Sequence, residues 1–297
     1  VVDGRVQFKS RHEALSIRAD LHGSVDDYTL YGLSTLPQPP SDSLVPERTG
    51  YSSGTTAQLR TFGSVESSLT VSFDRTQYNT ETVVRSGGAS TAAFREDRLS
   101  ADGRLTVPVG AAPLTLDALA QRAWYGGDVP AETSVRLDGG LSLQVVENAL
   151  ITAQVGGRAL RFEAPMSFRR DLGNASATFF APQGRVELSL GSEVTVFAEN
   201  APSLSSDGLD DLYAHSPYVE HAPSVRPTLY TTKAKSGFLF SLGPLRLEPT
   251  AGYRYAPSYR YVESPSPAAQ NGAFPVRYGS ARIVHGGAEL AIQGVPH

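Results

Sequence analysis

The chain has 297 residues, enough for one large domain, and its 26 basic and 30 acidic residues give a net charge of −4. A surface that is basic as a whole is thereby excluded, and we expect no nucleic-acid partner. Cysteine is absent, which excludes disulfides and cysteine-ligated metals, and no apolar run is long enough for a membrane-spanning helix.

Alternation of apolar and polar residues, the mark of a β-strand, recurs along the whole chain. It is visible near 15–21, 68–74, 114–121, 133–145, 185–190, 194–198 and 245–255. In the clearest run, Val135 and Leu137 share one face and Arg136 and Asp138 the other. The sequence therefore predicts an all-β domain over residues 1–297 with about fourteen antiparallel strands, the last two at 274–285 and 287–293.

The connections between these strands alternate in length. Short turns are expected at 63–64, 110–113, 147–148, 191–192 and 243–244, and long polar connections near 36–50, 76–92, 126–132, 163–174, 200–226 and 262–274. Several strand-like runs exceed ten residues, whereas strands of globular proteins have about 5–6. Long strands with short turns on one side and long loops on the other are typical of outer-membrane barrels. We therefore expect an up-and-down transmembrane β-barrel.

The polar faces of these strands carry charges of both signs. In a barrel this face lines the lumen, and in a soluble sheet it meets water, so the charges alone fit both. Under the barrel interpretation we expect the following charges to face the lumen: Arg18, Asp20, Arg136, Asp138, Arg185, Glu187, Arg246, Glu248 and Arg254.

Aromatic residues gather near the ends of several strands. Trp124 and Tyr125 end one run, Phe238 lies near the end of another, and Tyr253 and Tyr255 lie toward one end of a third. Such positions fit the aromatic girdles of a membrane barrel, although tyrosine is also a favoured strand residue in general.

The longest polar connection, 200–226, combines aromatic, apolar, acidic and proline residues. Either this loop contacts a ligand or a partner protein, or it packs over the mouth of its own barrel. For the first alternative the contact residues would be Leu212, Tyr213, His215, Tyr218 and His221. A metal site at His215 and His221 matches no established spacing, so we predict no metal there.

Residues 210–218 run into 225–228 at the entry to a long strand. This stretch, with Ser216-Pro217-Tyr218 and then Val225-Arg226-Pro227, resembles a pattern in the barrels of TonB-dependent receptors. The resemblance implies an outer-membrane location in a Gram-negative bacterium, with membrane lipid and surface or periplasmic proteins as partners. Neither the plug domain nor the TonB-contacting segment of that family is visible in these residues. The final residues do not read as a finished strand, so we expect a piece of a larger barrel.

No nucleotide-binding, metalloprotease or nucleophile-elbow motif occurs, and we expect neither an enzyme nor a cofactor. The expected function is transport or binding of a ligand or partner at the cell surface. Two alternatives stay open at this point: a secreted soluble β-sandwich that binds a ligand, and a structural barrel that holds other outer-membrane proteins.

Overall fold

The computed structural model describes residues 2–12, 14–29, 47–84, 88–110, 112–127, 132–163, 176–205, 208, 211–213, 225–263 and 274–292. Within them lie fifteen strands: β1 (Val2–His12), β2 (Leu15–Thr29), β3 (Glu47–Thr61), β4 (Glu66–Val84), β5 (Gly88–Val109), β6 (Ala112–Gly127), β7 (Glu132–Glu147), β8 (Ile151–Glu163), β9 (Ser176–Ser189), β10 (Val194–Asn200), β11 (Ser203–Ser205), β12 (Thr228–Tyr230), β13 (Thr232–Leu242), β14 (Leu245–Val262) and β15 (Val276–Ile292).

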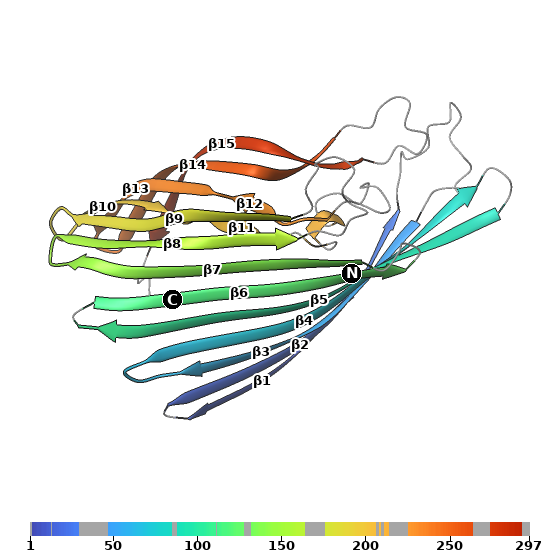
Figure 1. Cartoon of the computed structure of the whole chain (residues 1–297), viewed down its shortest axis with the longest axis horizontal. Helices are drawn as coiled ribbons and strands as arrows, with labels where there is room; N and C mark the ends of the chain where they lie inside the picture. The colour runs from blue at the N-terminus through green and yellow to red at the C-terminus, as the bar shows by residue number, and fades with distance from the viewer. Residues whose placement is uncertain are drawn as a thin grey trace.

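All of these strands belong to one antiparallel up-and-down sheet, in which neighbours in sequence are mostly neighbours in space (Figure 1). The order runs from β1 to β10 and continues through β13, β14 and β15, while β12 pairs with β14 and β11 pairs with β12. A single sheet is not a β-sandwich, so that alternative fold is wrong. Pairing between β1 and β15, which would close a barrel, is not present among the described residues.

The predicted alternation of short and long connections holds in part, because 85–87 between β4 and β5 and 128–131 between β6 and β7 are as short as the turns at the other end. Short turns join β1 to β2, β3 to β4, β5 to β6, β7 to β8, β9 to β10 and β13 to β14, and they lie together at one end of the strands (Figure 1). Glycines at positive φ occupy four of these turns, at Gly63, Gly110, Gly191 and Gly243, where a side chain would strain the backbone.

Two predicted boundaries are wrong. Most of the stretch 76–92, expected as a connection, extends β4 and β5 into a long hairpin, because backbone pairing continues there without an apolar face to mark it. The stretches 274–285 and 287–293, expected as two strands, form the single strand β15, because Gly286 and Gly287 pair with β14 instead of turning.

The two faces of the sheet differ sharply. We call the face that contacts residues 201–230 the inner face and the opposite one the outer face. On β6, Leu116, Ala118 and Ala120 point to the outer face, while Asp117 and Gln121 point to the inner one. Large apolar side chains stay exposed on the outer face of many strands, among them Phe8 at 62%, Phe180 at 79% and Val284 at 81%. An apolar surface of this extent marks contact with something other than water.

The only helical element in the described residues is a single turn at 211–213. No described helix has the length and apolar character needed to cross a membrane.

Candidate functional site

The inner face carries a folded-back segment that we call the inner segment, residues 201–230. The structure describes 201–205, 208, 211–213 and 225–230 of it. Its ends are held together, because the Ala201 amide donates to the carbonyl of Lys233 at 3.1 Å and the Lys233 amide donates to Asn200 Oδ1 at 2.9 Å. The chain therefore leaves β10 and re-enters β13 at almost the same point, with the inner segment between.

One part of the inner segment packs against the long hairpin of β4 and β5 and against the neighbouring strand β6. Leu212 and Tyr213 are each 1% exposed and belong to a buried cluster with Tyr78, Phe94 and Tyr125. The Tyr213 and Tyr78 rings have centroids 4.3 Å apart at 55°, a tilted arrangement favoured by aromatic pairs. The Arg48 guanidinium lies 4.1 Å from the Tyr213 ring centroid.

The same buried cluster reaches β15 at the far side of the sheet. Val276 and Tyr278 of β15 and Val225 of the inner segment belong to it. The Tyr278 hydroxyl accepts from the Arg226 amide at 2.8 Å and donates to the Arg226 carbonyl at 3.1 Å, while the Arg226 guanidinium lies 5.2 Å from the ring centroid. The inner segment thus connects β4–β6 with β15 across the inner face.

A second cluster fixes the short strands β11 and β12. Leu204 and Leu229 pair with each other and pack on Leu160 and Phe162 of β8, all four being almost fully buried. Arg136 of β7 donates to the Leu204 carbonyl and also to Gln121 Oε1, the latter at 3.3 Å. A charged side chain of the sheet therefore satisfies a buried backbone acceptor of the inner segment.

Toward the short turns the inner face carries a network of charges. Arg158 Nη2 lies 2.8 Å from Asp117 Oδ2 and 2.8 Å from Asp138 Oδ1, so one guanidinium on β8 joins carboxylates on β6 and β7. On the first strands, the Asp20 carboxylate accepts from Arg18 at 2.8 Å, from Gln7 at 2.7 Å and from Arg5 at 3.2 Å.

Similar pairs continue around the sheet. Arg185 pairs with both Glu187 and Glu199, and Glu248 pairs with Lys235 at 3.2 Å and with Arg246 at 3.5 Å. The Arg254 guanidinium lies 6.0 Å from the centroid of Tyr230 in the inner segment. Charges of both signs thus balance one another on this face, as in a wet interior and unlike a dry core.

The nine charges predicted from the alternation all lie on this network or next to it, and their exposure to a lumen stays a prediction. Leu212 and Tyr213 are packing residues in the structure, so their predicted role in ligand contact would require the segment to move. His215, Tyr218 and His221 lie outside the described residues. No group of three or more potential metal ligands occurs among the residues that are described.

Sequence reasoning missed three contributors to this site. Asp117 and Arg158 occupy polar positions of their strands, but nothing in the sequence places them beside Asp138. Tyr125, expected with Trp124 in a girdle, turns inward and is 4% exposed. Since adjacent strand residues face opposite ways, only one of Trp124 and Tyr125 could have faced outward.

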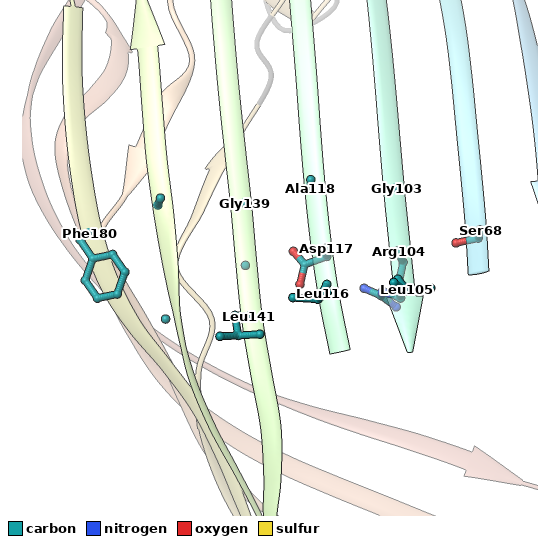
Figure 2. Close-up of a pocket in the computed structure, with 13 residues that line it drawn as sticks. Ser68, Gly103, Arg104, Leu105, Leu116, Asp117, Ala118, Gly139, Leu141 and Phe180 are labelled. Carbon is teal, nitrogen blue, oxygen red and sulfur yellow. The ribbon is translucent and has the colours of Figure 1, made fainter. Parts of the chain in front are cut away.

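A wide hollow of about 610 Å³ lies where β5, β6, β7 and β8 present small residues (Figure 2). Gly103, Ala118 and Gly139 sit side by side in adjacent strands there, between Leu105 and Phe180 (Figure 2). These positions belong to the outer face, so the hollow is separate from the inner segment.

No family model and no curated protein matches this sequence. Solved structures do match. The FrpB iron transporter from Neisseria meningitidis superposes with a TM-score of 0.65 at 10% identity, over 97% of this chain and 49% of that one. The fold is that of part of a TonB-dependent receptor barrel.

Two further structures give the same result. BauA, the ferric preacinetobactin receptor from Acinetobacter baumannii, matches with a TM-score of 0.61 at 12% identity, over 97% of this chain and 51% of that one. The copper transporter OprC matches with a TM-score of 0.64 at 13% identity, over 99% and 50%. The chain spans about half the length of the solved structures that it matches, and the resemblance to this barrel class predicted from the sequence is confirmed.

Proposed function

We propose that this chain forms part of an integral outer-membrane receptor that takes up a ligand through its barrel. The observation that carries the proposal is the contrast between the two faces, with exposed apolar side chains outside and balanced charges inside. A sheet with lipid on one face and a polar lumen on the other requires this distribution. The remaining strands of the barrel would come from further residues of a longer protein.

The inner segment supports a role in gating. It crosses the inner face at the end of the sheet where the long connections lie, and it contacts β4–β6, β8 and β15. A ligand that passes along the inner face must displace or pass this segment. We propose that the inner segment narrows the lumen and that three of its residues outside the described part of the chain, His215, Tyr218 and His221, contact the ligand.

The class of ligand is suggested by the neighbours. The solved structures that this chain resembles include a ferric preacinetobactin receptor, an iron transporter and a copper transporter. We propose that this protein takes up a metal ion or a metal complex. This ligand is cargo and needs no resident metal site in the barrel wall.

Cell fractionation tests the membrane location. The full-length protein is expected to stay with the outer membrane after a carbonate wash and to leave it only with detergent. Release into the aqueous phase without detergent would contradict the proposal.

Uptake tests the transport role. Deletion of the gene should lower accumulation of radioactive iron or copper in metal-limited cells, and the intact gene in trans should restore it. Unchanged accumulation of both metals, with the protein still in the outer membrane, would favour the alternative of a structural barrel that holds other proteins.

A further inference from the structure

Three arginines on alternate strands occupy equivalent positions on the outer face. Arg75 on β4 lies 12 residues after Gly63, Arg122 on β6 lies 12 after Gly110, and Arg161 on β8 lies 12 after Ala149, each counted from the short turn before its strand. All three side chains are exposed. We call these three residues the arginine row.

The pairing register of the strands shows that the three arginines lie at the same height along the barrel axis when the strands are tilted against that axis. Arg75 lies opposite Asp97, and Asp97 lies opposite Trp124, two residues beyond Arg122. Arg161 lies opposite Leu137, and Leu137 opposite Ala120, two residues before Arg122. The row therefore shifts by one residue per strand. With a rise of about 3.3 Å per residue and about 4.8 Å between strands, that shift corresponds to a tilt near 35°, as in barrels.

The height of the row matches the edge of a membrane. Twelve residues of a strand tilted by about 40° rise about 30 Å, close to the ~25 Å apolar band of outer-membrane barrels. Below the row, the outer-face positions of β4, β6 and β8 carry no charge back to the short turns. On the outer face of each of these strands, an arginine is thus the first charge met from the short turn.

The far side of the sheet repeats the pattern. Arg282 on β15 lies opposite Tyr255, which follows Gly243 by 12 residues. From the short-turn end of β15, Arg282 is again the first charge on the outer face. The recurrence on a fourth strand indicates that the position itself favours arginine.

The charge near the row is positive in total. Asp97 is shared by Arg75 at 2.6 Å and Arg95 at 3.2 Å, and Glu163 pairs with Arg161. Arg122 lies 5.0 Å from the Trp124 ring centroid and, within the described residues, has no carboxylate partner. The carboxylates of Asp97 and Glu163 therefore stand against four arginines, Arg75, Arg95, Arg122 and Arg161, which leaves a net charge of +2 at the membrane edge.

We propose that the arginine row binds the phosphate groups of an anionic lipid in the outer leaflet, with its acyl chains lying over the hollow between Leu105 and Phe180. The inference rests on the proposed function, because only a membrane-inserted sheet has lipid against its outer face. Guanidinium groups bind phosphate by paired hydrogen bonds, and this charge complementarity selects a phosphorylated lipid over a neutral one.

Lipid binding by the full-length protein, purified from outer membranes in mild detergent, tests this inference. Native mass spectrometry would count retained molecules of a phosphorylated outer-leaflet glycolipid, the same glycolipid after phosphatase treatment, and inorganic phosphate. The triple variant R75Q/R122Q/R161Q is compared with K9Q/R60Q/K233Q, whose three changes lower the charge equally but lie on the inner face, away from the hollow.

The native protein should retain the phosphorylated glycolipid over its dephosphorylated form, and the row variant should lose affinity by about fivefold per arginine. The inner-face control should keep native binding. Equal retention of both glycolipids, an unchanged row variant, or inorganic phosphate that binds as tightly as the lipid would overturn the inference. Release of the protein from membranes without detergent would instead overturn the proposed function.

Discussion

At the scale of single residues, many charged side chains on the inner face pair with opposite charges on the same strand or on nearby strands. Arg158 on β8 contacts Asp117 on β6 and Asp138 on β7, so these contacts join three strands. The contact of Arg18 with Asp20 lies along a single strand, β2. The exposure of the paired side chains on the inner face varies, from 4% for Asp138 to 47% for Arg246 in its pair with Glu248. The energetic importance of each pair should follow that burial.

Removal of the Arg158 side chain tests this relation. Arg158→Ala leaves Asp117 and Asp138 facing each other without a cation, and we expect a loss of about 1–3 kcal/mol in the free energy of unfolding, between the values for exposed and buried pairs. Arg246→Ala removes a single exposed contact and should cost below about 1 kcal/mol. Urea unfolding in lipid vesicles measures both, and equal losses would contradict the account.

Tyr213 tests how the inner segment is held. Tyr213→Ala removes the contacts with Tyr78 and Arg48 and should destabilise the packed segment by about 3–5 kcal/mol, as for other buried aromatic truncations. Limited proteolysis should then cut within the inner segment while the sheet stays intact. Tyr213→Phe keeps the ring and should resist cleavage like the native protein; cleavage of both variants at the same rate would show that the ring does not hold the segment.

At the scale of strands, alternation identified the faces correctly, whereas partners far apart in sequence could not be predicted. Leu116 and Leu119 differ by three positions on β6, and their opposite faces follow from the period of two. Leu204 was expected in the connection 200–226 because it lies in no alternating run, and Leu229 was expected in the long strand that follows. Their burial depends on Leu160 and Phe162 of β8, about forty or more residues away, and no local pattern encodes that contact.

The same two leucines of β6 offer a matched test of which face meets lipid. Leu116→Arg places a charge near the middle of the apolar band and should cost about 2–4 kcal/mol. Leu119→Arg is the same substitution on the inner face, where charges already lie, and should cost clearly less. Folding yield into vesicles and urea unfolding measure both. A larger loss at Leu119 would reverse the assignment of the faces.

At the scale of the whole molecule, the six short turns lie together at one end of the sheet (Figure 1). In an outer-membrane barrel the short turns face the periplasm. Because the chain has no cysteine, single cysteines report this orientation without background. In intact cells a membrane-impermeant maleimide should label Ser86→Cys, in the connection between β4 and β5, and should label Ser64→Cys only after the outer membrane is permeabilised. The opposite pattern would invert the orientation.

The most direct test of the central claim, that the outer face lies against lipid, is a nitroxide scan of β6 from Leu114 to Gln121 in the membrane-inserted protein. Collision with oxygen should be high at Leu114, Leu116, Ala118 and Ala120, and collision with a water-soluble reagent high at Thr115, Asp117, Leu119 and Gln121, so the two accessibilities alternate with a period of two in opposite phase. Alternation with the reverse phase, or water-soluble reagent reaching both faces equally, would contradict the account.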